Sequence, residues 1–294
     1  MHEIGEQTDW ARHPENLLFA YHRELIYWTN CWREQAPAVL RRLDDALRCD
    51  CPQFAIDMVE RLRAEGCTKP KVLDFGCGPF SNLCHLQRSG LADVTGVDAL
   101  AEEYGQLYRE FGIEPPVPLV AASGETLLDG RVQGPFDFVF VQNALDHTAA
   151  PALSWLNLYE LTREGGFLGH CHGVDEATHE QQDQLRLFNL RPDDSATLLL
   201  DDLQGYERSL VGGLDLSLEY ACQIPISDDY DYFVQIWRKT GSGVSAELLR
   251  TVNENLRRAF VRRSRWAFTL EDRLLNQREL AADEPSFQLA ANKP

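Results

Sequence analysis

The chain lacks long apolar runs and a surplus of positive charge. No stretch approaches the length of a membrane span, and the first residues hold no apolar core typical of a secretory signal. Lys and Arg number 28 against 46 Asp and Glu, which gives a formal net charge of −18. Because such a surface repels phosphate, nucleic acid and anionic membranes are disfavoured as partners. We therefore expect a cytoplasmic protein.

Cysteines with disulfide or metal-site spacing are also missing. The eight cysteines are scattered, and Cys49 and Cys51 would need two further ligands to bind zinc. We expect free thiols in a reducing compartment. The segment His170-Cys-His172, followed by acidic residues and His179, contains metal-ligating types. Acidic residues there also suit the first turn of a helix, so we predict no metal.

An apolar run that enters a glycine-rich turn is the most informative stretch. Residues Lys71–Phe75 are mostly apolar and predict a buried parallel strand. Gly76-Cys-Gly78 follows, where missing side chains permit a sharp turn and close approach to a ligand. Ser81–Gly90 predicts a helix, Val94–Val97 a second strand, Ala101–Phe111 a further helix and Val117–Ala121 a third strand. Asp98, at the end of the second strand, is placed to accept hydrogen bonds from ribose hydroxyls.

The order of these residues resembles the class I S-adenosylmethionine (SAM)-dependent methyltransferases. Asp74, the two glycines and Asp98 match the family's acidic residue, glycine-rich turn and ribose-binding acid. The resemblance covers Lys71 to Lys239 and implies a doubly wound, mostly parallel seven-stranded α/β sheet of the Rossmann-like kind, with SAM as cofactor. It assigns cofactor binding to Asp74, Gly76, Cys77, Gly78, Asp98, Ala99, Ser123, Gly124, Gln142 and Asn143.

The family usually has an aspartate at the position of Ser123, so the adenine contact must come here from a hydroxyl or from backbone amides. The alternatives to SAM are a strand-turn-helix without a ligand, or a different nucleotide.

Two histidines follow predicted strands at the edge where such sheets bind ligands. His147 comes after a strand at Phe136–Gln142, and His172 after one at Phe167–Cys171. Either could act as a general base, since imidazole titrates near neutral pH. The alternative for His147 is structural packing under the next helix. We name both as candidate catalytic residues.

Two segments flank the expected core and divide the chain. Residues 1–67 predict helices, among them an aromatic-rich one and a second at Ala38–Leu47, and in the family such helices often form a lid or cap. Residues 68–240 are the SAM-binding core. Within the core, 177–206 is an insertion of the kind that shapes an acceptor pocket. Residues 241–294 form a C-terminal extension with a helical pattern from Ser245 to Ala282. We place Tyr21, Trp28 and His179 in the substrate pocket.

The C-terminal helical pattern carries a basic patch in an otherwise acidic chain, made of Arg257, Arg258, Arg262, Arg263 and Arg265. Pairing with the chain's own acidic surface or with a second subunit is favoured over nucleic acid. A homodimer through this helix is one option.

We therefore predict an enzyme that transfers the methyl group of SAM to a small-molecule acceptor, at oxygen or nitrogen. One alternative is a SAM lyase or cyclase that acts on the aminocarboxypropyl side and releases methylthioadenosine. Another is a SAM-binding scaffold without catalysis. The sequence does not identify the acceptor.

Overall fold

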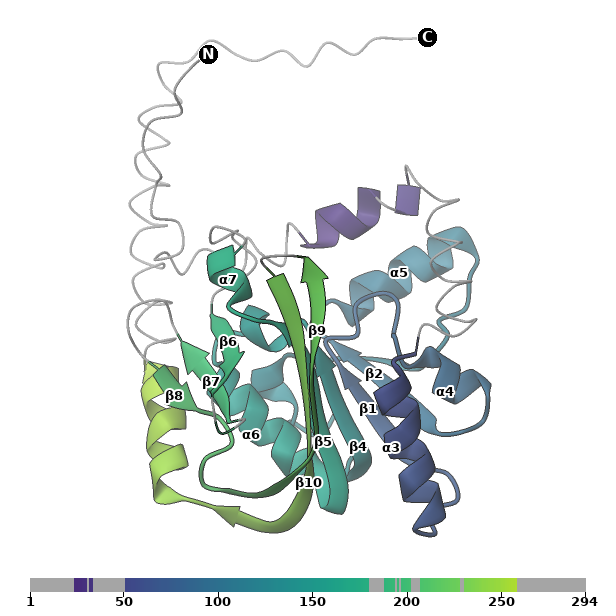
Figure 1. Cartoon of the computed structure of the whole chain (residues 1–294). Helices are drawn as coiled ribbons and strands as arrows, with labels where there is room; N and C mark the ends of the chain where they lie inside the picture. The colour runs from purple at the N-terminus through teal and green to yellow at the C-terminus, as the bar shows by residue number, and fades with distance from the viewer. Residues whose placement is uncertain are drawn as a thin grey trace, which may run out of the picture.

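The computed structural model describes residues 24–30, 32–33, 51–179, 188–193, 195, 197–201, 207–227 and 230–257 (Figure 1). Residues 24–30, 32–33 and 246–257 are helical, in agreement with the predicted N-terminal and C-terminal helices. The predicted helix at Ala38–Leu47, the residue Tyr21 and most of the C-terminal basic patch lie outside the described residues. None of the described helices is long and apolar enough to cross a membrane.

A seven-stranded sheet forms the centre of the molecule, with the strand order β3-β2-β1-β4-β5-β10-β9. The first five strands are parallel to one another, while β10 runs antiparallel to both β5 and β9. This is the predicted doubly wound, mostly parallel fold. The strands are β1 (Lys71–Phe75), β2 (Asp93–Asp98), β3 (Leu119–Ala121), β4 (Phe136–Gln142), β5 (Thr162–Gly173), β9 (Leu214–Ser227) and β10 (Tyr230–Val244).

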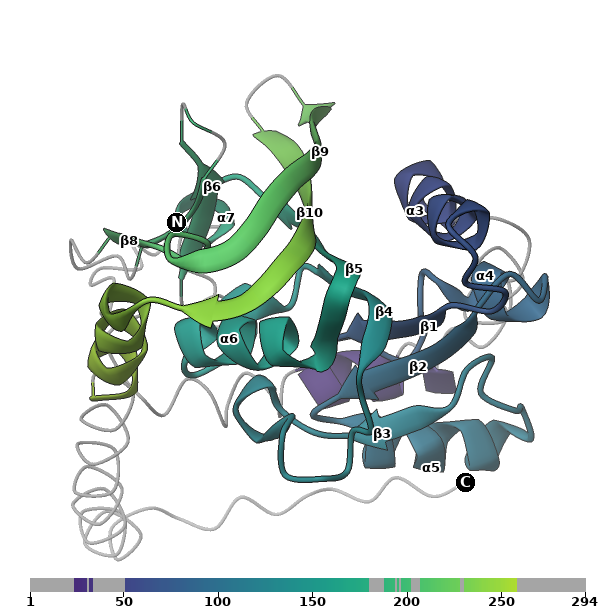
Figure 2. The same ribbon diagram turned by 90° about the horizontal axis from the view of Figure 1, so that it is seen from below.

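Helices cover both faces of this sheet, and α3 and α6 lie on opposite sides (Figure 2). The alternation of side chains along β1 divides it between two cores: Val72 packs with the α3 residue Phe54, and Leu73 with the α6 residue Trp155. Because both faces are buried, β1 is apolar almost throughout. The helices are α3 (Gln53–Ala64), α4 (Cys84–Arg88), α5 (Ala101–Phe111), α6 (Pro151–Leu161) and α7 (Glu176–His179), with the 3-10 turns η2 (Gly124–Thr126) and η3 (Leu145–His147).

The insertion after β5 and the residues directly after it form a second, three-stranded antiparallel sheet, which was not predicted. Its strands are β6 (Asn189–Pro192), β7 (Leu198–Asp201) and β8 (Glu207–Ser209). Leu190, Leu198 and Leu200 are buried and join the core on the α6 side of the main sheet. The small sheet therefore packs as part of the domain, beside α7 and the helix at 246–257 (Figure 1).

Helix α4 begins at Cys84, three residues later than the predicted start at Ser81. The Ser81 hydroxyl donates a hydrogen bond to Asp74 Oδ2 (2.6 Å) and accepts one from the Leu83 N–H (3.2 Å). The side chain of Ser81 thus competes with helix formation and delays it. Two other boundaries also differ from the prediction, since β3 starts at Leu119 rather than Val117 and β5 extends to Gly173.

Asp74 is an acidic residue in an apolar strand and is only 3% exposed. Burial raises the pKa of Asp74 to about 7, and the charge of Asp98 adds to the rise, whereas the hydrogen bond from Ser81 lowers it. The native protein therefore holds this proton at pH values where an unfolded chain has lost it.

We expect the free energy of unfolding to carry a contribution from Asp74 that falls as pH rises from about 4 to about 7. The sign follows because the folded pKa is raised above the unfolded value near 3.8, so the native state binds more protons over this interval. Asp74→Asn should remove this contribution, which is on the order of a few kcal/mol. Urea unfolding at several pH values measures it.

The matched control is Asp93→Asn, which changes an exposed carboxylate at the start of the neighbouring strand β2. It should leave the pH dependence as in the unmodified protein. If the free energy of unfolding of Asp74→Asn has the same pH dependence as that of the unmodified chain, burial does not raise the pKa of this carboxyl group.

Candidate functional site

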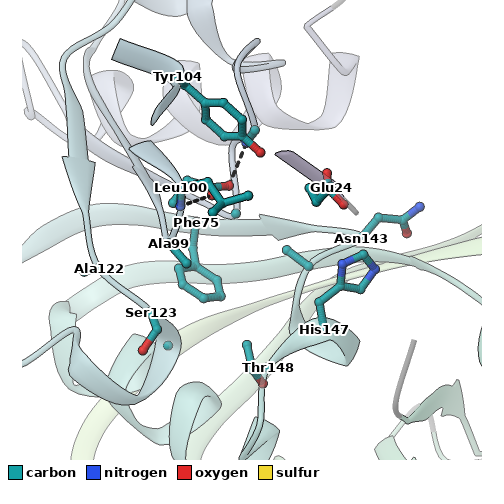
Figure 3. A pocket seen from close by; sticks show the side chains of 15 residues that line it. Glu24, Phe75, Ala99, Leu100, Tyr104, Ala122, Ser123, Asn143, His147 and Thr148 are labelled. Carbon is teal, nitrogen blue, oxygen red and sulfur yellow. Dashed lines mark hydrogen bonds between the residues drawn. The ribbon is translucent and has the colours of Figure 1, made fainter. Parts of the chain in front are cut away.

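A cavity lies at the carboxyl ends of β1, β2, β3 and β4, where open α/β sheets bind ligands (Figure 3). Figure 3 shows Asn143, His147 and Glu24 gathered at one end of this cavity, which we call the donor cavity, and Ser123 at the other. Its lining consists of Glu24, Phe75, Gly76, Gly78, Asp98, Ala99, Leu100, Tyr104, Ala122, Ser123, Gly124, Asn143, Ala144, His147 and Thr148.

The glycine-rich turn forms the floor of the donor cavity. Gly76 and Gly78 have φ angles of 67° and 58°, a backbone conformation that other residues rarely adopt. A Cβ atom on Gly76 would lie 2.0 Å from the Cβ of Ala144, so no side chain fits between β1 and the loop after β4. The Gly76 N–H donates to the Val97 carbonyl (2.7 Å), which ties the turn to β2.

Asp98 is held by backbone hydrogen bonds to both of its oxygens. Its Oδ2 accepts from the Gly78 N–H (3.0 Å) and its Oδ1 from the Leu100 N–H (2.8 Å). Each carboxylate oxygen can accept a further hydrogen bond. Burial raises the pKa of Asp98 to about 6, while the two backbone hydrogen bonds lower it. The carboxylate is thus ionised at neutral pH and oriented to accept from a diol.

At the other end of the cavity, Ser123 begins the short turn η2. Its N–H donates to Thr126 Oγ1 (3.0 Å), and the two hydroxyls lie 3.3 Å apart. A Cβ on Gly124 would lie 2.2 Å from Ser154 Oγ, so this loop also packs tightly. The carboxylate of Glu125 accepts from the Ala150 N–H (2.9 Å) and is directed to the start of α6. Polar contacts to a nucleobase at this end would therefore come from Ser123 and from the backbone.

These features fit a nucleoside that carries a sulfonium group. The glycine turn allows a ligand to approach the backbone, and Asp98 offers oxygens to a ribose diol. Glu24, in the helical segment at 24–30, adds a second carboxylate to the lining, and the sequence analysis did not identify it. A carboxylate near a positively charged sulfur is electrostatically favourable.

Three of the predicted cofactor residues do not line the donor cavity. Asp74 lies beneath the turn, bonded to Ser81. Cys77 is 8% exposed, its Sγ lies against the Gly78 carbonyl (3.3 Å), and burial raises its pKa well above the ordinary value. Gln142 pairs with Cys171 between β4 and β5. Their contribution is to hold the strand ends that carry the lining residues.

The two candidate bases occupy different environments. His147 lines the donor cavity and its side chain is 23% exposed, whereas His172 is 1% exposed and does not line it. The buried carboxylate of Asp146 lies between them, with Oδ2 3.7 Å from His147 Nε2 and Oδ1 3.6 Å from His172 Nδ1. Asp146 was not among the predicted site residues, although its position directly before His147 was a usable signal.

Asn143 closes the donor cavity on the side of β5 and β10. It has a φ angle of 47°, which is uncommon for a residue other than glycine. Its N–H donates to the Cys171 carbonyl (3.0 Å), and its Nδ2 donates to the Tyr232 hydroxyl (2.6 Å). Tyr232 lies opposite Gly173 in the β5–β10 pair. Asn143 therefore connects the donor cavity to the ends of both strands.

Of the predicted substrate-pocket residues, Trp28 and His179 are described. Trp28 Nε1 donates to Glu24 Oε1 (2.9 Å), and its ring packs edge-on against Phe80, so it supports the lining without being part of it. His179 lines a second cavity with a different set of residues. This second cavity is lined by Val174, Asp175, Thr178, His179, Gln223, Tyr230 and Asp231.

The residues that the structure describes contain no group of three or more His, Cys, Asp or Glu side chains arranged to hold a metal ion. The segment His170-Cys-His172 is buried instead. His170 Nε2 lies 3.1 Å from Gln235 Oε1, its ring stacks on Trp237, and burial lowers its pKa well below the ordinary value.

Comparison with known proteins agrees with this geometry. Residues 73–169 match the family described as "Methyltransferase domain". This range runs from β1 through β5 and includes most of the donor cavity lining. A comparison with curated proteins found no match.

Several solved structures are similar to the chain at low identity. A 1,6-didemethyltoxoflavin-N1-methyltransferase from Burkholderia thailandensis, with S-adenosylhomocysteine bound, has 20% identity and a TM-score of 0.43 over 75% of this chain and 89% of its own. The N-methyltransferase NodS from Bradyrhizobium japonicum, also with S-adenosylhomocysteine, has 13% identity and a TM-score of 0.42 over 68% and 98%. The [4+2]-cyclase SpnF has 13% identity and a TM-score of 0.39 over 64% and 83%. At TM-scores this low, no acceptor transfers to this chain from any of them.

The family match covers the strands and loops that build the donor cavity, and the strand order is that expected for this fold. The cofactor is SAM, and the chain is an enzyme. Residues 73–169 are thus similar to the methyltransferase-domain family, and the strand order is that of a Rossmann-like methyltransferase fold.

Proposed function

We propose that this methyltransferase acts on a small-molecule acceptor, at an oxygen or a nitrogen atom. The observation that carries the proposal is the donor cavity, where Asp98 is oriented by two backbone N–H groups beside the Gly76 turn. The net charge of −18 disfavours nucleic acid as the acceptor.

When bound, SAM supplies a methyl group on a positively charged sulfur; the acceptor's lone pair takes this methyl, the electrons of the S–C bond stay on sulfur, and S-adenosylhomocysteine remains. The protein contributes chiefly by orientation, since holding two reactants in line supplies a large part of the rate enhancement. Asp98 would fix the ribose, and Ser123 with its backbone the base.

We assign His147 as the residue that takes the acceptor's proton when the acceptor is a hydroxyl or a protonated amine. Its ring lies in the lining, and with Nε2 directed to the Asp146 carboxylate, Nδ1 is the nitrogen available to the cavity. His172 would act only indirectly, through the shared Asp146. Tyr21, Trp28 and His179 remain proposed acceptor-side residues. The division at 1–67, 68–240 and 241–294, the cytoplasmic location and the homodimer stay predictions.

The first test incubates the purified protein with SAM alone and then with candidate acceptors, and follows the products by mass spectrometry. We expect SAM to remain intact without an acceptor, and S-adenosylhomocysteine to form together with a methylated acceptor. Steady release of methylthioadenosine from SAM alone would overturn methyl transfer in favour of cleavage on the aminocarboxypropyl side.

A second test concerns Asp98. Asp98→Asn removes the charge and places an amide donor against a backbone N–H, so SAM and S-adenosylhomocysteine should bind about 10- to 100-fold more weakly. Isothermal titration calorimetry measures this. Asp93→Asn, on the same strand but at its other end, should bind as the unmodified protein does. If both variants bind SAM and S-adenosylhomocysteine with equal affinity, Asp98 is not part of the binding site.

A further inference from the structure

We propose that the second cavity binds the acceptor and selects a molecule that carries a positive charge, an amine in chemical class. The proposal rests on the proposed methyl transfer and adds the chemistry by which the acceptor is recognised. Its residues come from the segment 174–179, which follows the carboxyl end of β5, from β9, and from the start of β10, which is antiparallel to β5. Both cavities therefore open at the same edge of the sheet.

A short series of side chains connects the two cavities. Asn143, in the lining of the donor cavity, donates to the Tyr232 hydroxyl (2.6 Å). The Tyr232 ring packs edge-on against Tyr230, with ring centroids 5.6 Å apart, and Tyr230 lines the second cavity. Tyr230 and Tyr232 thus link the second cavity to Asn143, beside which the reacting end of an acceptor would enter the donor cavity.

The charges in the second cavity favour a cation. Two carboxylates line it, and Asp175 pairs with Arg191 at 3.1 Å. Asp231 accepts a hydrogen bond from the neutral Gln223 (2.8 Å), and among the described residues it has no ionic partner. Its negative charge adds to that of a chain whose net charge is already −18. An ammonium group beside Asp231 would form a charge-assisted hydrogen bond.

The aromatic residues of the second cavity suit the same ligand. His179 stacks on Tyr230 with ring centroids 4.4 Å apart and an interplanar angle of 11°. Glu176, which is 4% exposed, lies near the Tyr230 hydroxyl beside Gly173. Tyr230 Oη and Glu176 Oε2 come within 1.8 and 2.9 Å of the position that a Cβ on Gly173 would take, so the glycine gives them room. A tyrosine ring and a carboxyl group close to each other both favour a cation nearby.

In this arrangement the positive group anchors the acceptor and a second group reacts. The ammonium lies at Asp231, and a hydroxyl or neutral amine at the other end reaches past Asn143 toward the methyl group. The lone pair of that second group forms the new bond to carbon, the S–C electrons remain on sulfur, and the displaced proton passes to His147 or to water. The anchoring charge is unchanged in the reaction.

The test uses three phenols of similar size that differ in charge: tyramine, p-cresol and 4-hydroxyphenylacetate. Each is titrated into the full chain saturated with S-adenosylhomocysteine, and affinity is measured by ligand-observed NMR. We expect tyramine to bind about tenfold more tightly than p-cresol, and 4-hydroxyphenylacetate more weakly than both, because one ion pair contributes on the order of 1 kcal/mol.

Asp231→Asn should reduce the preference for tyramine over p-cresol to about twofold or less, without changing the affinity for S-adenosylhomocysteine. The matched control is Asp57→Asn on α3, which also removes a carboxylate that accepts from a glutamine side chain, that of Gln53 (2.8 Å). It should retain the full preference. A preference that is absent, or that survives Asp231→Asn, overturns the inference.

These outcomes are separable from failure of the proposed function. If the chain does not bind S-adenosylhomocysteine or does not transfer a methyl group, the proposed function is wrong. If it does both, while the three phenols bind alike, methyl transfer stands and only the amine selectivity fails.

Discussion

The close approach of β1 to the loop after β4 is the constraint on which the donor cavity depends. Gly76 meets Ala144 so closely that a single Cβ would fill the space. This contact lets the backbone turn toward β2, where the Gly76 N–H bonds the Val97 carbonyl and the Gly78 N–H bonds Asp98. One missing side chain thus sets both the floor of the cavity and the orientation of its carboxylate.

Carboxyl groups gather at this edge of the sheet, at a cost that the surrounding structure offsets. Burial raises the pKa of Asp74 to about 7 and of Asp98 to about 6, and backbone or hydroxyl donors oppose the rise at each. Asp146 is also buried there, between two histidines. A positively charged ligand nearby favours the ionised form of such groups. The arrangement therefore suits a sulfonium donor and, on our proposal, a cationic acceptor.

The elements that sequence reasoning predicted well are those with a strong local pattern. Helix α5 begins at Ala101 and ends at Phe111 as predicted, because its apolar residues recur at helical spacing and Gly112 ends it with a φ of 65°. Helix α4 was predicted to start too early, since the side chain that delays it bonds a residue seven positions away. The three-stranded sheet of the insertion was not predicted, because its strands are only three or four residues long.

By itself, the sequence determined the fold class, the SAM cofactor and the positions of Gly76, Gly78 and Asp98, because these depend on neighbours along one βαβ unit. Only the tertiary structure decided which histidine reaches the donor cavity, that Asp146 lies between both, and that Glu24 enters the lining from the N-terminal segment. It also brought Asn143 to Tyr232, 89 positions later in the chain. Such contacts depend on strand order and on the face of the sheet that each side chain occupies. No local sequence pattern encodes the distance between two residues that lie so far apart in the chain.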